Sequence, residues 1–220
     1  MDFPTGRVLA ESLGYQARDL DRLPAGTLEA FVGAAPLAEL VLAESSAGLV
    51  VDCGAGGGVD SLLLALNGRP VAALEREPLL VDRLRRSTRL LHADLAAPVM
   101  VVRACLPEIP LAAAIAQTVM MNGVANLIQN RNRLLSECFR VLKDGGRFLI
   151  ADLLALEPLP TELTEDPEAW AWCVGGAGTV ADWLCRLEAA GFIGGRVELL
   201  ETFSPIGRVV IRAARPERGE

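Results

Sequence analysis

A cluster of glycines directly after a short apolar segment constrains the fold of this chain more than any other feature. Residues 49–51 (Leu-Val-Val) predict a buried parallel strand. The loop Asp52–Gly58 follows with the sequence Asp-Cys-Gly-Ala-Gly-Gly-Gly, and Val59–Leu66 then predicts a helix. Glycines permit positive φ angles and let a ligand approach the backbone closely. Because a strand, a glycine loop and a helix in this order commonly hold a polar or anionic ligand, we expect an α/β fold with its ligand site at this loop.

The spacing of the glycines separates two kinds of cofactor loop. The pattern GxGxxG, typical of nicotinamide-dependent oxidoreductases, is met at Gly54 and Gly56 but fails at its third position, which is Val59. The pattern DxGxGxG is met in full by Asp52, Gly54, Gly56 and Gly58. The second pattern is therefore favoured, and an oxidoreductase is the weaker alternative.

Apolar strand-like segments and helical segments alternate along the rest of the chain. This alternation predicts a doubly wound, seven-stranded, mostly parallel sheet with helices on both faces. The last two strands have only a short connection around Ser204-Pro205, so we expect a hairpin whose last strand is antiparallel. The expected strands are 49–51, 71–75, 99–102, 119–121, 147–152, 196–202 and 208–213, and the expected helices are 59–66, 78–95, 131–142 and 180–190.

The chain shows no internal repeat, low-complexity tract or linker, so we expect one domain over residues 1–220. Residues 1–47 are expected to form a helical lid, with a break at Pro24 and a second helix over Thr27–Ser45. Residues 48–220 are expected to form the Rossmann-like core. The stretch Glu157–Pro167 is rich in proline and acidic residues and predicts loops.

Charge and apolar pattern limit the classes of partner. The net charge is −7, which argues against a large nucleic-acid interface and favours a small-molecule substrate. The longest uncharged run, Ile109–Asn130, approaches the length of a membrane span, but Pro110, Gln117 and Asn122 interrupt it. We therefore expect no contact with a membrane, and the sequence leaves the oligomeric state open.

The five cysteines include no CxxC pair, so we expect a reducing cytoplasm, no disulfide framework and no metal site. The N-terminus lacks the basic, apolar and small-residue order of a secretion signal. The only histidine, His92, falls on a predicted helix and is interpreted as a surface residue.

Two further motifs extend the pattern of the glycine loop. Glu75 follows the second predicted strand, where its carboxylate can accept hydrogen bonds from both hydroxyls of a ribose. The stretch Phe139–Phe148 resembles the helix, turn and strand that precede the fifth strand in class I S-adenosylmethionine-dependent methyltransferases, and Gly191-Phe192 also fits. The resemblance implies S-adenosyl-L-methionine as cofactor, with the glycine loop around its methionine part. It also places cofactor contacts at Ala55, Arg76, Cys105, Leu106 and Met121.

Several segments resemble the arsenite methyltransferase family more specifically, over nearly the whole chain. They are Gly14-Tyr15, Leu23-Pro24, Val50–Ala65, Ile109–Leu111, Asn122–Leu127, Phe139–Asp152 and Trp170–Ala177. Members of that family bind trivalent arsenic through three cysteines, because thiolates bind soft, thiophilic centres well. The resemblance therefore identifies the positions at which arsenic ligands are expected.

This chain departs from the family at two of the three cysteine positions. The stretch that matches the first is Val32–Pro36, where Gly33 stands in place of cysteine, and the second position is Gly123. Only Cys173 remains, and one thiolate cannot form a three-sulfur site. Cys173 is accordingly interpreted either as a residue that meets the acceptor or as a small apolar residue between two tryptophans.

The expected reaction is an in-line displacement at the methyl group, for which positioning supplies most of the rate. A thiol or a metalloid needs little help from a base, whereas a hydroxyl or an amine needs a general base. No acidic residue or histidine follows the fourth predicted strand. Asn122 stands there instead, and it is expected to orient the cofactor or the acceptor. We therefore predict methyl transfer to a small soft acceptor, with Asn122 and Cys173 as catalytic candidates. A catalytically inactive member of the fold, which would bind cofactor or a partner, is the alternative.

Overall fold

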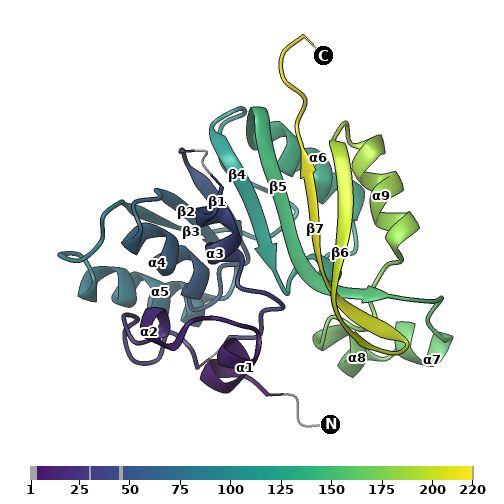
Figure 1. The fold of residues 1–220 in the computed structure, drawn as a ribbon, viewed down its shortest axis with the longest axis horizontal. Coiled ribbons are helices and arrows are strands. Elements are labelled where there is room, and N and C mark those ends of the chain that lie inside the picture. The colour runs from purple at the N-terminus through teal and green to yellow at the C-terminus, as the bar shows by residue number, and fades with distance from the viewer. Residues whose placement is uncertain (1–3, 30, 45–46, 220) are drawn as a thin grey trace.

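The computed structural model describes residues 4–29, 31–44 and 47–219. Its centre is a seven-stranded sheet with the strand order β3-β2-β1-β4-β5-β7-β6 (Figure 1). The paired strands β1 to β5 are parallel, and β7 runs antiparallel to both β5 and β6. The mostly parallel sheet with an antiparallel last strand is therefore confirmed. The strands are β1 Val50–Cys53, β2 Val71–Glu75, β3 Val99–Arg103, β4 Ala116–Asn122, β5 Leu142–Ala155, β6 Ile193–Phe203 and β7 Ile206–Ala214.

Helices lie on both faces of the sheet (Figure 1). The helices on one face come from the N-terminal half of the chain, and α6 and α9 lie on the other face. The helices are α1 Gly6–Ser12, α2 Ala17–Leu20, α3 Leu37–Leu42, α4 Val59–Leu66, α5 Pro78–Leu90, α6 Arg131–Val141, α7 Thr161–Thr164, α8 Pro167–Ala171 and α9 Val180–Ala189, with a short 3₁₀ helix, η1, at Ala125–Leu127.

The alternation of side chains along the strands divides the core into two layers. In β1, Val50 belongs to the core layer that includes residues of α3 and α4, and Val51 belongs to the other layer, which includes residues of α6 and α9. Successive residues of a strand point to opposite faces of a sheet, so a strand covered on both faces is apolar throughout. This explains why the short run before the glycine loop has no polar alternation.

The predicted helix that follows the glycine loop is confirmed as α4, with the same bounds, and all eight of its residues are buried. Its burial results from its position between the sheet and the N-terminal segment, since α3 packs against it. The second strand also has the predicted end, at Glu75. The local sequence therefore determines the strand, loop and helix that carry the candidate site.

The prediction of a helix over Thr27–Ser45 was wrong. Among the described residues of this stretch, helix is confined to α3, and Ser45 lies outside the described residues. The stretch 31–36 is irregular because the backbone N–H of Ala34 bonds to the side chain of Asn122, and Pro36 precedes the first turn of α3. Bonds to the rest of the molecule replace the helical bonds that this stretch would otherwise make.

Three other stretches differ from the expected elements. α5 ends at Leu90 rather than at residue 95, because the chain turns back and the N–H groups of Ala96 and Ala97 both bond to the carbonyl of Ala65. The stretch predicted as loops contains α7 and the start of α8. β5 is longer than predicted, because it pairs with β7 as far as Ala155.

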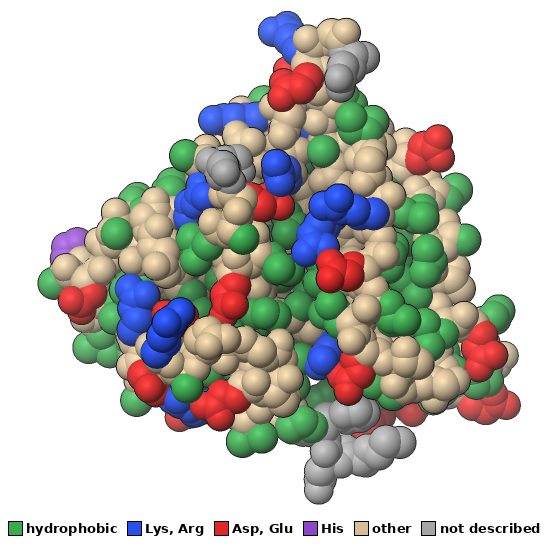
Figure 2. All heavy atoms as spheres, in the orientation of Figure 1, with side chains coloured by type: hydrophobic (Ala, Val, Ile, Leu, Met, Phe, Trp, Pro, Cys, Tyr) green, Lys and Arg blue, Asp and Glu red, His purple; other side chains and the backbone are tan. Residues whose placement is uncertain are grey.

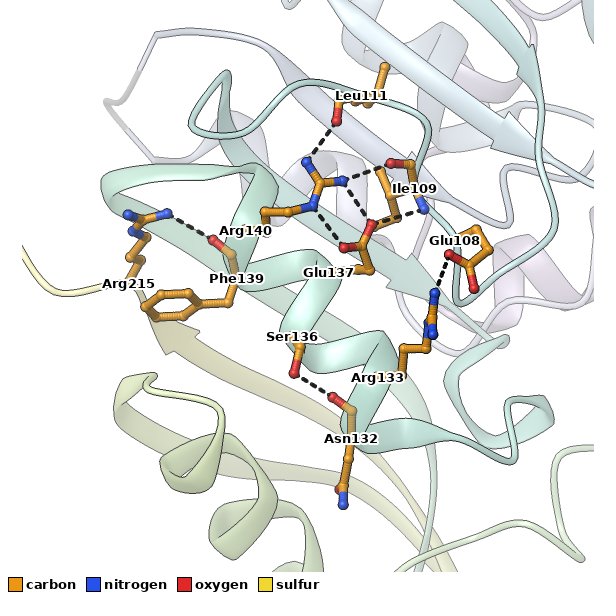
Figure 3. Close-up of polar contacts among 10 residues, drawn as sticks. All are labelled: Glu108, Ile109, Leu111, Asn132, Arg133, Ser136, Glu137, Phe139, Arg140 and Arg215. Carbon is orange, nitrogen blue, oxygen red and sulfur yellow. Dashed lines mark hydrogen bonds and ion pairs between the residues drawn. The ribbon is translucent and has the colours of Figure 1, made fainter.

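Arg140 on α6 fixes the connection between β3 and β4. Its guanidinium donates to the carbonyl oxygens of Ile109 and Leu111, both at 2.8 Å, and it pairs with Glu137 (Figure 3). The pairing lowers the pKa of Glu137, whose carboxylate also accepts from the N–H of Ile109. This cluster holds the loop that carries Leu106 toward the site described below.

The surface mixes charges of both signs. Figure 2 shows basic and acidic side chains interspersed over one face of the molecule. On β7, Arg208 pairs with Glu201 at 2.8 Å and Arg212 pairs with Glu198 at 2.5 Å. Within the described ranges, no helix is both long and apolar enough to cross a membrane.

Candidate functional site

A cavity of about 290 Å³ opens at the carboxyl ends of β1, β2 and β4. The strand order reverses between β1 and β4, and ligands of open α/β sheets bind in the crevice at such a switch point. Its volume lies near the lower limit of about 300–1,000 Å³ that is usual for ligand pockets. Four parts of the chain contribute most of the lining residues: 31–33, 52–60, 74–80 and 122–128.

The glycine loop leaves room for a ligand at its centre. Gly54 and Gly56 have φ angles of +80° and +57°, which side chains rarely adopt. A Cβ atom on Gly56 would meet nothing within 4 Å, so the backbone there borders open space. Gly58 has another role, since a Cβ atom there would overlap the side chain of Leu84. Gly54, Ala55 and Gly56 line the cavity, whereas Gly58 lets α5 pack against the loop.

Glu75 faces the same cavity from the end of β2. Its carboxylate accepts hydrogen bonds from three backbone N–H groups, those of Gly56, Arg76 and Glu77, at 2.8–2.9 Å. The side chain is therefore fixed in place by the backbone. A carboxylate held in this way at a cavity edge is suited to bind a pair of vicinal hydroxyls.

Two buried acidic residues lie beside the glycine loop. Asp52 is 3% exposed, and burial, together with the nearby negative charge of Asp60, raises its pKa to about 7. The hydroxyl of Ser61 donates to its Oδ2 at 2.6 Å. Burial also raises the pKa of Asp60, while hydrogen bonds from Asn122 and Tyr15 oppose that rise. Both side chains line the cavity, and when ionised they give this part of it a negative potential.

Asn122 lines the cavity at the end of β4, but its amide is bonded to protein groups. Its Oδ1 accepts from the N–H of Ala34 at 2.6 Å. Its Nδ2 lies 2.8 Å from the carbonyl of Ala35, 2.8 Å from Oδ2 of Asp60 and 3.1 Å from the hydroxyl of Tyr15. The sequence predicted a side chain that orients the cofactor or the acceptor. The structure surrounds it with the N-terminal segment and α4.

Cys173 does not line the cavity. Its thiol is buried and donates to the carbonyl of Gly123 at 3.3 Å, so it lies behind the wall that Gly123 forms. Burial, followed by the charge of Asp152, raises the pKa of the thiol. Asn126 bonds to the carbonyl of Cys173 at 3.1 Å and also to Asp152, which fixes this position further.

The two glycines at expected cysteine positions lie close together. A Cβ atom on Gly123, whose φ is +69°, would come within 2.6 Å of the carbonyl oxygen of Val32 and 3.5 Å of the Cα atom of Gly33. A Cβ atom on Gly33 would come within 2.5 Å of the ring of Phe31. The three positions that the resemblance identified therefore converge, but the backbone of Val32 fills the space that a side chain at Gly123 would need, and the side chains of Phe31 and Asn122 fill the space beside Gly33.

The other expected residues fall into two groups. Arg76 and Leu106 line the cavity. Met121 is fully buried in the core, and Cys105 is exposed beside Arg103, outside the main lining. His92 is exposed, as the sequence indicated.

Sequence reasoning missed three residues of the site, namely Tyr15, Phe31 and Asp60. Asp60 had a readable signal, because it is the only charged residue in the apolar run of α4 and follows the glycine loop by two residues. Tyr15 is the only tyrosine of the chain, but nothing in its neighbourhood indicates that its hydroxyl reaches Asp60, 2.8 Å away. Phe31 fell inside the wrongly predicted helix.

The chain is similar to known methyltransferases in sequence. Residues 44–191 match the family described as a methyltransferase domain. The arsenite methyltransferase of Halobacterium salinarum is 30% identical over 186 residues, which are 83% of this chain but 46% of that protein. The chain thus spans less than half of the length of this relative.

Solved structures share the fold at low sequence identity. The arsenic(III) S-adenosylmethionine methyltransferase of Chlamydomonas reinhardtii superposes with a TM-score of 0.71 at 20% identity, over 92% of this chain and 74% of that one. The geranyl diphosphate C-methyltransferase of Streptomyces coelicolor, solved with S-adenosyl-L-homocysteine, gives 0.68 at 16% identity, over 81% of this chain and 75% of that one. At these sequence identities the similarity shows a shared fold.

Proposed function

The chain belongs to the class I S-adenosylmethionine-dependent methyltransferases, and we propose that it transfers the methyl group of S-adenosyl-L-methionine to a small acceptor that reacts as a soft nucleophile. One observation carries the proposal. A single cavity combines an open glycine turn and the fixed carboxylate of Glu75 with an apolar part that contains no free base.

The residues of the donor part fit the cofactor. Glu75 presents a carboxylate suited to the two ribose hydroxyls, and the open backbone at Gly56 leaves space for the methionine part. Asp52 and Asp60 give the adjoining wall a negative charge, which favours the positively charged ammonium and sulfonium groups of the cofactor. When bound, S-adenosyl-L-methionine supplies a methyl group on a good leaving group. Arg76 and Leu106 line the same part of the cavity and are proposed as further contacts.

The acceptor part of the cavity is apolar. Its lining on the N-terminal side includes Phe31 and Val32, and its lining after β4 includes Val124, Leu127 and Ile128. The ionisable groups of the lining belong instead to the ends of β1 and β2 and to the residues that follow these strands. These side chains can therefore desolvate and orient an apolar acceptor, but they cannot remove a proton from it.

A thiol is the acceptor class that such a wall suits best. Its lone pair forms the new bond to the methyl carbon while the carbon–sulfonium bond breaks and leaves its electron pair on the departing sulfur. The thiol proton passes to solvent, and a thiol ionises near neutral pH without a strong base. An alcohol or a protonated amine lacks this property and needs a base beside it, which the apolar side chains of Phe31, Val32, Val124, Leu127 and Ile128 do not supply.

Arsenite bound by three thiolates is not part of the proposal. Gly123 cannot be cysteine without displacing the carbonyl of Val32, and the thiol of Cys173 donates to that same glycine's carbonyl behind the wall. A metalloid that already carries an organic group or a bound thiol needs fewer ligands and remains within the soft acceptor class. The inactive alternative has no support in the cavity, because Asp52, Glu75 and the glycine turn all line it.

Calorimetry and a methyl-transfer screen test the proposal in two steps. The protein is expected to bind S-adenosyl-L-methionine and S-adenosyl-L-homocysteine in the micromolar range, whereas nicotinamide dinucleotides should not bind. Turnover is then followed as S-adenosyl-L-homocysteine formed with thiophenol, with phenol as its hydroxyl analogue, with benzylamine and with arsenite. Turnover confined to the thiol supports the proposal. Equal turnover of the phenol would contradict the soft acceptor, and absence of cofactor binding at millimolar concentration would contradict the whole proposal.

A further inference from the structure

The amide of Asn122 joins three parts of the molecule that are distant in sequence. It stands at the end of β4, it accepts from the N–H of Ala34 at 2.6 Å, and its Nδ2 is 2.8 Å from Asp60 on α4. The same nitrogen lies 2.8 Å from the carbonyl of Ala35. The N-terminal segment, the helix after the glycine loop and the β4 strand therefore meet at one side chain.

Each part that meets there also forms a wall of the cavity. Residues 31–33 line its apolar part and continue directly into Ala34 and Ala35. Asp60 lines its acidic part and is two residues from the glycine turn. The hydroxyl of Tyr15 closes the junction, because it donates to Oδ1 of Asp60 at 2.8 Å and accepts from Asn122.

We propose that Asn122 is a positioning residue that couples closure of the 31–36 segment over the cavity to binding of the methyl donor. The inference rests on the proposed function and specifies how the donor part of the cavity is linked to its acceptor part. Asn122 suits the task because its amide donates and accepts at once. Its oxygen accepts from the backbone N–H of Ala34. Its nitrogen lies within hydrogen-bond distance of the carbonyl of Ala35 and of the carboxylate of Asp60, which lines the acidic part of the cavity.

The charges around this amide indicate a specific perturbation. Asp60 faces it directly and Tyr15 adds a hydroxyl. Asp52 interacts electrostatically with Asp60, and Glu39 of α3 adds negative charge near Asp60. An Asn122→Asp variant keeps the oxygen that accepts from Ala34. Its second oxygen replaces the hydrogen-bond donor Nδ2 and faces the carboxylate of Asp60 and the carbonyl of Ala35. When the introduced carboxyl is ionised, Asp60 repels it; when it is protonated, it again offers a hydrogen-bond donor.

The experiment measures the Kd for S-adenosyl-L-homocysteine by calorimetry at pH 8 and pH 6, for the unmodified protein and for Asn122→Asp. The ratio of the two Kd values removes the effect of other titrating groups, including Asp52. We expect a ratio of about tenfold or more at pH 8, as for loss of a buried bond to a charged group, and a clearly smaller ratio at pH 6. Asn132→Asp is the matched control, because Asn132 is exposed on α6 and its oxygen still accepts from Arg186.

Two further measurements separate positioning from folding. In the unmodified protein, S-adenosyl-L-homocysteine should slow hydrogen exchange in a peptide that covers residues 31–36, and Asn122→Asp should abolish that slowing at pH 8. The double variant Asp60→Asn with Asn122→Asp exchanges amide and carboxylate across the same contact, so it should recover most of the affinity. It also replaces the single variant if that variant does not fold.

The possible results distinguish failure of the coupling through Asn122 from failure of the proposed function. If the unmodified protein binds and Asn122→Asp binds equally well, or is weakened by the same factor at both pH values, the coupling is wrong and the proposed function stands. If the double variant is no better than Asn122→Asp, the direct contact with Asp60 is wrong as its basis. Failure of the unmodified protein to bind would overturn the proposed function and this inference together.

Discussion

Replacement of Asp52 by asparagine should stabilise the free protein at alkaline pH while it weakens cofactor binding. Asp52 is buried, and its pKa is raised to about 7 by desolvation and by the charge of Asp60. The folded state therefore binds a proton that the unfolded chain releases near pH 4. A raised pKa of this kind contributes stability that is complete below the unfolded pKa and is lost as the pH rises to the folded pKa.

The magnitude follows from the size of the shift. Each pKa unit corresponds to about 1.4 kcal/mol, so ionisation of Asp52 lowers the free energy of unfolding by about 4 kcal/mol between pH 4 and pH 8. Between pH 5 and pH 8 the loss is about 3 kcal/mol. The amide introduced by Asp52→Asn cannot ionise and retains an oxygen for the bond from Ser61, so the variant should not show this loss.

Urea denaturation of both proteins at pH 5 and pH 8 measures the effect. The relevant quantity is the difference between the two proteins at each pH, because other groups titrate in the same range, including Asp152, whose pKa burial raises to about 6. This difference should move in favour of Asp52→Asn by about 3 kcal/mol from pH 5 to pH 8. Cofactor affinity at pH 8 should fall at the same time. Parallel pH curves for the two proteins would refute the reasoning.

Three more substitutions test separate parts of the site. Glu75→Gln should raise the Kd for S-adenosyl-L-homocysteine by about tenfold or more, because the amide cannot accept from all three N–H groups, while Glu198→Gln on β6 should have no effect in the same titration. Cys173→Ser should retain turnover and melting temperature, since a hydroxyl can donate to the same carbonyl, and loss of turnover in a folded Ser variant would show that the thiol takes part in the chemistry. Gly58→Ala should lower the free energy of unfolding by about 1–3 kcal/mol more than Gly68→Ala does, because both positions have positive φ but a Cβ atom has open space only at Gly68; equal losses would contradict this.

The core of the fold was readable because its signals are local. The strand before the glycine loop, the loop and α4 are consecutive, and each depends on propensities within a few residues. Glu75 was predictable for a related reason: a parallel neighbour strand ends at the same edge of the sheet, and Cys53 pairs with Leu74, directly before Glu75. Where the topology brings the ends of parallel strands to one edge of the sheet, the sequence suffices to predict that residues at these ends lie close together.

The N-terminal segment was not readable for the opposite reason. Whether residues 31–36 continue a helix is decided by partners that are distant in sequence, since Ala34 bonds to Asn122, 88 residues away. Cys173 is a similar case. Its neighbours in sequence suggested either a site residue or a packing residue, but its thiol donor contact with Gly123 spans 50 residues. Tertiary contacts of this kind override local propensity and leave no periodic pattern to detect.

Under the proposed function, the two glycines that face each other relate the shared architecture to a different acceptor class. With no side chain at Gly33 and Gly123, the backbones of residues 32–33 and of Gly123 approach closely, and the apolar side chains of Val32 and Val124 remain to line the cavity beside them. Reintroduced thiols would have to separate these backbones, and Asn122 holds the first of them in place. The same junction therefore sets both the position of the N-terminal wall and the chemistry that this wall can offer. We infer that acceptor choice in this protein is determined by the missing side chains as much as by those present.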